Sequence, residues 1–350
     1  MIIKTGRSES IAAELQAPNH SSPISIEGLK INTFIGTQPF CAAAITHIHS
    51  MAHLAIDSLQ SSAPSLMTNF AAPLTIESRV SLNSGHRMPI LGFGTWKLER
   101  AEEACSEAIK IGYRHLDSAR IYRTEADVSN AVQKSTEDRG IMFLTTKVRR
   151  NEHGYENCKK ALLDSITAPK PEYWDLVLLH DPLSGPEARH EAYRALAEAQ
   201  QAGNLKSIGV SNFGVDHLEK LQEADVGPTP AVNQLELHPW CQQTSIVEYC
   251  RSKGIIVQAY CPLARGQYFS DDTLVKIASK VRKTPAQVLL RWSLQKGFVP
   301  LPKSSSPERM KENASIFDFE LEDQDMIELD SLNKDDKGSV TWTPCFKEVK

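Results

Sequence analysis

Short runs of apolar and β-branched residues recur along the chain from about Arg79 onward, and the segments between them carry apolar residues at helical spacing. The helical pattern is clearest in residues 99–111, 187–203, 215–224 and 284–297. Strands and helices that alternate in this way predict a parallel sheet, and eight repeats favour a closed (β/α)8 TIM barrel of the α/β class. The eight predicted strands begin at Ile90, Tyr113, Ile141, Trp174, Ser207, Ala231, Ile255 and Phe298.

Two short runs around residues 83–85 (Asn-Ser-Gly) precede the first repeat and predict a β-hairpin that caps the barrel. An open Rossmann sheet is the alternative architecture. Its fingerprint is incomplete, because the "GFGTWK" stretch from Gly92 lacks the third glycine at the required spacing. The closed barrel therefore remains the preferred prediction.

The first 66 residues differ from the rest, since they are rich in Ser, Ala, His and Ile and show no long helical stripe. We expect residues 1–66 to be a disordered, dispensable leader and residues 67–350 to form the barrel domain. Glu9 and Glu14 argue against a mitochondrial transit peptide, and no secretory signal pattern follows the first residues. Whether this leader exists in the native protein stays open.

Composition excludes several classes of protein. The 350 residues are 41% hydrophobic and 23% charged, with a net charge of −4 and no basic block, so nucleic-acid binding is not expected. No apolar run reaches the roughly 18 residues of a membrane span. Seven scattered cysteines without a C-x-x-C pair favour a reduced, cytoplasmic location. The oligomeric state leaves no trace in the sequence, and a monomer is consistent with it.

Polar side chains follow the predicted strands where each one ends, which is the edge at which barrels of this kind build their active sites. Each of these residues alone has an ordinary structural explanation, such as a solvated charge or a hydrogen-bonded strand end. Together they predict a functional site, and they are Thr95, Trp96, Asp117, Lys147, His180, Ser211, Asn212, Gln234, Tyr260, Lys303 and Ser304.

The chemistry of this set points to protonation of an oxygen. Tyr122 follows Asp117 by five residues and has an ordinary pKa of about 10, which a nearby cation would lower. Lys147 can supply the cation, Asp117 can orient it, and His180 can donate a hydrogen bond to a substrate oxygen. Because no strong nucleophile and no metal cluster accompanies them, a hydride cofactor fits best.

The stretch "LPKSSSPERMKEN" provides Lys303, Ser304, Ser306 and Arg309 at the start of a predicted helix, a combination that suits phosphate groups. A solvated charged turn is the simpler alternative. A nicotinamide ring is accommodated by an aromatic face from Tyr260 and by amides from Asn212 and Gln234.

In these motifs the chain resembles the aldo-keto reductase family. The matching stretches, in order, are "MPILGFGTW", "GYRHLDSARIYRTE", "FLTTKV", "LLHDP", "IGVSNF", "NQLELHP", "AYCPL" and "PLPKSSSPERMKEN". The resemblance implies NADPH-dependent reduction of aldehydes or ketones, with Tyr122 as general acid, Asp117 and Lys147 as its tuners and His180 orienting the substrate. It implies cofactor contacts, with NADPH or NADP+, from Thr95, Asp117, Ser211, Asn212, Gln234, Tyr260, Leu263, Lys303, Ser304, Arg309, Glu312 and Asn313.

Substrate contacts are expected from Trp96, His180 and Asp181, with Trp240 and the loop near Trp342 as further wall residues. The chain departs from the usual family pattern at three positions, which are Asp181 beside His180, Cys261 and Thr124. Asp181 makes the pocket wall more polar, and the loops that follow are short. An open, permissive pocket for a small carbonyl compound is therefore expected.

Two other functions remain as alternatives. A non-enzymatic barrel that binds NADPH and regulates a partner would share the cofactor site. A metal-dependent hydrolase would use His47 and His49, which form an H-x-H pair, but the last predicted strand provides no further ligand. No metal site is therefore expected.

Overall fold

The computed structural model describes residues 73–167, 173–342 and 344–346. Eight parallel strands follow one another in sequence order around the sheet. They are Phe93–Gly94 (β3), His115–Asp117 (β4), Phe143–Val148 (β5), Trp174–Leu179 (β6), Leu205–Ser211 (β7), Val232–Glu236 (β8), Ile256–Tyr260 (β9) and Val299–Pro300 (β10).

The sheet closes on itself. The Gly92 amide donates to the Pro300 carbonyl at 3.0 Å, and the Gly94 amide donates to the Pro302 carbonyl at 3.0 Å, so the last strand pairs with the first. The predicted (β/α)8 TIM barrel is thereby confirmed, with all eight strands near the predicted positions. The strands are buried on both faces; in β6, for example, all six residues from Trp174 to Leu179 are buried. Burial on both faces explains why the strand sequences are continuous apolar runs.

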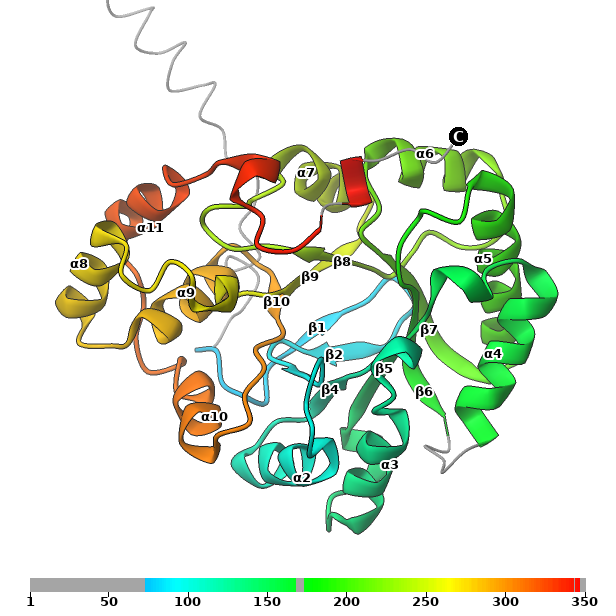
Figure 1. Ribbon diagram of the computed structural model, residues 1–350, viewed down its shortest axis with the longest axis horizontal. Helices are drawn as coiled ribbons and strands as arrows, with labels where there is room; N and C mark the ends of the chain where they lie inside the picture. Colours follow the sequence, from blue (N-terminus) through cyan, green and yellow to red (C-terminus); the bar gives the residue numbers. More distant parts are fainter. Residues whose placement is uncertain (1–72, 168–172, 343, 347–350) are drawn as a thin grey trace, which may run out of the picture. The chain divides into compact units, whose positions relative to one another are not determined.

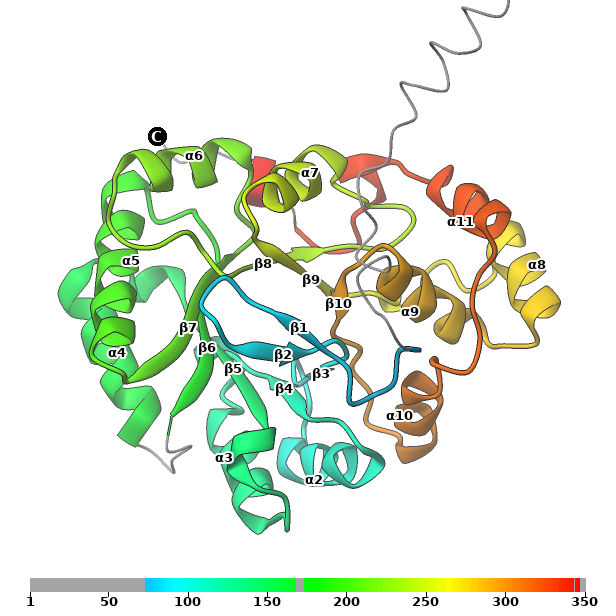
Figure 2. The ribbon, with the colours of Figure 1, turned by 180° about the vertical axis from the view of Figure 1, so that it is seen from behind.

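Helices surround the barrel in both ribbon views (Figure 1 and Figure 2). Where a helix begins, the sequence provides the expected caps: Thr284 and Gln287 form a capping box around Pro285 at the start of α9. The helices are Ala101–Ile111 (α2), Glu125–Lys134 (α3), Tyr155–Thr167 (α4), Pro186–Gln201 (α5), Val215–Glu223 (α6), Thr244–Ser252 (α7), Asp272–Val281 (α8), Pro285–Gln295 (α9), Pro307–Ala314 (α10) and Asp323–Asp330 (α11).

The predicted hairpin is present as Arg79–Ser81 (β1) paired antiparallel with Arg87–Pro89 (β2). Its turn residue Asn83 donates to the carbonyls of Thr229 and Pro230 at 3.3 and 3.1 Å, just before β8 begins. Figure 2 shows the hairpin across the barrel at this end. The hairpin therefore covers the end where the strands begin, and the opposite end stays accessible.

The predicted leader, residues 1–66, and the His47 and His49 pair lie outside the described residues, so the domain boundary stays a prediction. Within residues 73–346, gaps excepted, no group of three or more His, Cys, Asp or Glu side chains could hold a metal ion. Among the helices that the structure describes, none is both long and apolar enough to span a bilayer.

Candidate active site

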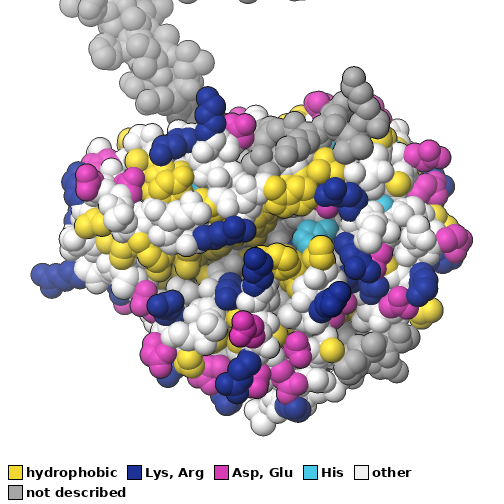
Figure 3. Space-filling model, viewed as in Figure 1, with side chains coloured by type: hydrophobic (Ala, Val, Ile, Leu, Met, Phe, Trp, Pro, Cys, Tyr) yellow, Lys and Arg dark blue, Asp and Glu magenta, His cyan; other side chains and the backbone are white. Residues whose placement is uncertain are grey.

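A cavity of about 1100 Å³ opens at the carboxyl ends of the strands. Figure 3 shows the hollow with apolar side chains along its wall, a histidine within it, and Lys and Arg side chains around its rim. The predicted site residues that line it are Trp96, Asp117, Tyr122, His180, Asp181, Ser211, Asn212, Gln234, Tyr260, Leu263, Lys303, Ser304, Arg309, Glu312 and Asn313. The structure thus brings nearly all of the predicted residues to one place.

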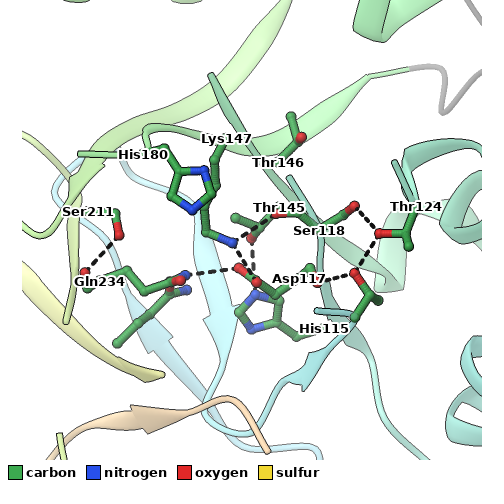
Figure 4. A network of polar contacts seen from close by, with 12 residues as sticks. His115, Asp117, Ser118, Thr124, Thr145, Thr146, Lys147, His180, Ser211 and Gln234 are labelled. Atoms are coloured by element: carbon green, nitrogen blue, oxygen red, sulfur yellow. Dashed lines mark hydrogen bonds and ion pairs between the residues drawn. The ribbon is translucent and has the colours of Figure 1, made fainter. Parts of the chain in front are cut away.

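A buried ion pair lies at the base of this cavity. The Lys147 ammonium, fully buried, donates to Asp117 Oδ1 at 2.6 Å and to the Ser118 carbonyl at 2.8 Å (Figure 4). The two residues come from the adjacent strands β5 and β4, whose register is set by the barrel. Burial lowers the pKa of Lys147, and the Asp117 carboxylate opposes that change. The pair therefore needs both partners to remain charged.

The second oxygen of Asp117 is also held. Gln234 Nε2 donates to Asp117 Oδ2 at 2.9 Å and to Gln258 Oε1 at 2.7 Å, so both amide hydrogens are used and the Gln234 oxygen remains for a ligand. On the other side, the Thr95 hydroxyl donates to the Asp117 carbonyl at 2.9 Å and contacts Thr124 at 2.8 Å. Asp117 is consequently fixed from three directions.

Thr95 was expected to contact the cofactor, but its side chain is fully buried and it is not among the residues that line the cavity. Its hydroxyl instead supports the main chain at Asp117. Thr124, which departs from the usual family pattern, belongs to the same hydrogen-bond network. Its hydroxyl lies 2.8 Å from Ser118 Oγ as well as 2.8 Å from the Thr95 hydroxyl.

Tyr122 sits on a short 3₁₀ turn, Arg120–Tyr122, directly after β4. Its ring centre lies 4.9 Å from the Lys147 ammonium and 5.6 Å from the His180 ring centre. Burial, together with the nearby Asp117 carboxylate, raises the pKa of Tyr122 well above its ordinary value. This direction is opposite to the sequence-based expectation, because Asp117 largely neutralises Lys147 and burial disfavours the phenolate. Tyr122 is therefore a phenol at neutral pH.

His180 is the first residue after β6, and its amide donates to the Val148 carbonyl at 2.9 Å. Burial, with the Lys147 charge adding to it, lowers the pKa of His180 to about 3, so the ring is neutral. Its ring nitrogens make no hydrogen bond to any of the described residues. One N–H is therefore available to an oxygen in the cavity.

Side-chain amide and hydroxyl groups lie next to Tyr122 and His180. Asn212 Nδ2 donates to the His180 carbonyl at 3.1 Å, while the Tyr260 hydroxyl donates to Asn212 Oδ1 at 2.9 Å. Asn212 has a φ of 61°, the left-handed region that Asn tolerates better than most residues. Ser211 completes the group through a 2.9 Å bond to the Gln234 carbonyl.

The far end of the cavity is cationic. Ser306 caps α10 by accepting from the Arg309 amide at 3.3 Å, and Pro307 occupies the first turn. The exposed Lys303 and Arg309 side chains flank this helix start, where main-chain N–H groups and the helix dipole favour an anion. The cavity thus has amide and aromatic groups at one end and an anion-binding site at the other. This arrangement fits nicotinamide adenine dinucleotide phosphate.

One expectation about the substrate wall needs correction, and a second gains detail. Trp240 does not line the cavity, since it is fully buried and stacks on Tyr268 with ring centres 4.2 Å apart. Asp181 does line it, but its Oδ1 accepts from Arg150 Nε at 2.9 Å and from the Leu183 amide at 2.9 Å. The wall at Asp181 is thus polar, as expected, and its charge is paired with that of Arg150.

Sequence reasoning missed several lining residues: Arg149, Arg150, Asn151, Arg265 and Phe269. The run "RRN" follows β5 directly, so reading a few residues past each strand end would have found three of them. Phe269 carries no such signal, because it lies nine residues past the end of β9. Thr341 and Trp342 both line the cavity, which places the expected C-terminal loop in its wall.

Comparison with known proteins agrees with this geometry. The Aldo/keto reductase family model matches residues 90–334. Glyoxal reductase of Bacillus subtilis is 41% identical over 76% of this chain and 96% of its own length. An aldo/keto reductase from Brucella melitensis has a similar structure, with a TM-score of 0.71 and 40% identity, covering 75% of this chain and all of its own.

A Bombyx mori aldo-keto reductase solved in complex with NADP is also similar, with a TM-score of 0.69 and 31% identity over 75% of this chain and 94% of that one. The family match covers well over half of the chain and reaches across the whole barrel. The chain therefore belongs to the aldo/keto reductase family, whose members are oxidoreductases that reduce carbonyl groups with NADPH.

Proposed function

We propose that this protein reduces an aldehyde or ketone to the alcohol with NADPH, and that Tyr122 is the general acid. The observation that carries the proposal is that Tyr122, His180 and Asp117 line one cavity. The buried Lys147 ammonium bonds to Asp117 and lies 4.9 Å from the Tyr122 ring centre. These groups can protonate an oxygen but cannot reduce a carbon. A bound nicotinamide cofactor would supply the hydride.

The cavity has groups for both ends of that cofactor. The carboxamide would meet Ser211, Asn212 and the free oxygen of Gln234, and Tyr260 would pack against the ring. The phosphate-bearing end would lie at the start of α10, where the contacts proposed are Lys303, Ser304, Arg309, Glu312 and Asn313, with Leu263 along the way. The two cations favour NADPH over NADH.

The proton steps follow from the protonation states of the residues. The neutral His180 ring donates one N–H to the carbonyl oxygen and so orients it toward Tyr122. As negative charge develops on that oxygen, the Tyr122 phenol transfers its proton to it. Lys147, held by Asp117, then stabilises the phenolate that remains.

The location of the protein is part of the proposal. Six of the seven cysteines lie in the described part of the chain, and all six are free thiols. Free thiols persist in a reducing compartment, so we infer a cytoplasmic enzyme that acts on small carbonyl compounds.

The substitution Tyr122→Phe tests the mechanism, with Tyr155→Phe as control because Tyr155 lies outside the cavity and bonds only to surface groups. We expect Tyr122→Phe to lower NADPH-dependent aldehyde reduction by about 10² to 10⁴-fold, the usual contribution of a general acid, while NADPH still binds. Reduction can be followed by NADPH absorbance, and binding by protein fluorescence. Retained reduction would contradict the mechanism, and NADPH binding by a wild-type protein that reduces no carbonyl would favour the regulatory alternative.

A further inference from the structure

Glu236, the last residue of β8, has a buried carboxylate that the mechanism above does not use. Its partners come mainly from the chain's C-terminal segment. Ser339 Oγ donates to Oε2 at 2.7 Å, the Val340 amide donates to Oε1 at 2.6 Å, and the Thr341 hydroxyl also contacts Oε2. His238 Nε2 also lies 3.1 Å from Oε1. Burial by itself would raise the pKa of Glu236, but the four hydrogen bonds together outweigh burial and lower the pKa. Glu236 is thus ionised at neutral pH.

The same C-terminal segment, residues 339–342, forms part of the cavity wall. Thr341 and Trp342 line the cavity, and the Arg150 guanidinium lies 5.2 Å from the Trp342 ring centre. In both ribbon views the segment lies near α7, and its red colour in Figure 1 distinguishes it from the barrel strands. A wall built from the end of the chain requires an anchor in the barrel.

Close packing on both sides of residues 339–342 restricts the path of this segment. A Cβ on Gly338 would lie 1.6 Å from the Trp240 carbonyl oxygen, so only glycine permits this approach. The Lys334 amide donates to the same carbonyl at 3.0 Å, and a Cβ on Gly214 would lie 2.2 Å from the Cys345 carbonyl oxygen. The segment therefore follows a defined course across the β8 and β7 loops.

We propose that Glu236 is a positioning residue for substrate: its carboxylate holds residues 339–342 so that Thr341 and Trp342 form the wall against which the organic part of a bulky aldehyde packs. This rests on the proposed carbonyl reduction. An ionised carboxylate removed from water needs its donors, so the segment and Glu236 stabilise each other. Because Glu236 lies on a barrel strand, the wall takes its position from the rigid scaffold.

The proposal predicts a dependence on substrate size. A large aromatic aldehyde such as naphthaldehyde would reach Trp342, whereas propanal would fill only the space beside Tyr122 and His180. Loss of the anchor should therefore raise the Michaelis constant for naphthaldehyde about tenfold relative to that for propanal, with a smaller change in kcat, since charged hydrogen bonds are the stronger ones.

Two variants test the anchor independently. Glu236→Gln keeps the side-chain shape but replaces one accepting oxygen with an amide that cannot accept. Gly338→Ala displaces the segment without touching β8, so it remains informative if the first variant folds poorly. Glu198→Gln is the control, because Glu198 is on the outer helix α5 and accepts a surface bond from Tyr155.

Three measurements on the full chain decide the outcome: the Michaelis constant and kcat for both aldehydes, the dissociation constant of naphthaldehyde with NADP+ present, and amide hydrogen exchange of a peptide covering residues 338–346. We expect faster exchange at this peptide and weaker naphthaldehyde binding in both variants but not in Glu198→Gln. Faster exchange with unchanged binding and an unchanged ratio of Michaelis constants would overturn the proposal, as would unchanged exchange in Glu236→Gln. A wild type that oxidises no NADPH with either aldehyde would refute the proposed function, while the binding measurement would still test the wall.

Discussion

The two ends of the cavity each contain a lysine, but in opposite settings. Lys147 at the acid end is fully buried and bonded to Asp117 and a carbonyl, whereas Lys303 at the anion end is exposed on the loop after β10. The first lysine has its partners within the protein. The second offers its charge to whatever anion enters.

The difference has a physical cause. A buried cation must be paired inside the fold, because removing one partner leaves an uncompensated charge. An exposed cation keeps its hydration until a ligand arrives, so its loss costs the fold little. Substitutions at the acid end should therefore lower both the reaction rate and the free energy of unfolding. Substitutions at the anion end should weaken cofactor binding alone.

The largest expected effect is that of Lys147→Met. The Asp117 carboxylate would be left buried without its counterion, and the Tyr122 phenolate would lose its stabilising charge. We expect carbonyl reduction to fall by about 10²-fold or more, with the free energy of unfolding lower by about 3 kcal/mol. Steady-state kinetics measure the loss of activity, and urea denaturation measures the loss of stability. A variant with the wild-type free energy of unfolding would contradict the claim that the acid end stabilises the fold.

The dependence of stability on pH tests whether the buried, neutral histidines of the acid end and its surroundings contribute to the free energy of unfolding. Burial lowers the pKa of His115 and His180 to about 3 and that of His153 to about 4, below the value of about 6.5 expected in the unfolded chain. The unfolded state therefore binds more protons below pH 6.5, and stability is full above that pH. It is lost as pH falls toward 4, by up to about 1.4 kcal/mol per histidine per pH unit.

Urea denaturation at pH 7 and pH 5 measures this loss. His153→Gln supplies a control outside the acid group, since His153 Nδ1 lies 2.7 Å from Ser184 Oγ and the amide can keep that bond. This variant should lose less stability than the wild type between the two pH values. An identical loss would show that His153 does not titrate on unfolding.

The smallest effect is expected at the anion end. Lys303→Met and Arg309→Met should each raise the Kd of NADPH about tenfold while the free energy of unfolding stays within about 0.5 kcal/mol of wild type. Fluorescence titration with NADPH and NADH compares the cofactors, and NADH should be affected less because it lacks the 2′-phosphate. Lys311→Met, on the same helix α10 but not on the cavity wall, is the control. Equal losses for both cofactors would contradict a phosphate contact.

Much of the site could be found from the sequence because strand ends in a barrel converge. Asp117, Lys147 and His180 were predicted from their places after apolar runs, and the structure brings them together. Trp240 was misplaced because an aromatic side chain after a strand can point either into the cavity or into the packing behind it. Local pattern does not distinguish the two, and here Trp240 stacks on Tyr268 in the packed loops.

By itself the sequence determined the order of eight strands, the capping hairpin and the residue types at the strand ends, because these depend on spacing between near neighbours. Only the tertiary structure decided that the pKa of Tyr122 is raised rather than lowered, that Gln234 holds Asp117, and that Glu236 anchors a cavity wall 103 to 105 residues further along the chain. Burial and hydrogen-bond partners depend on how the barrel closes and where its last segment packs, and neither is written in the spacing of neighbouring residues.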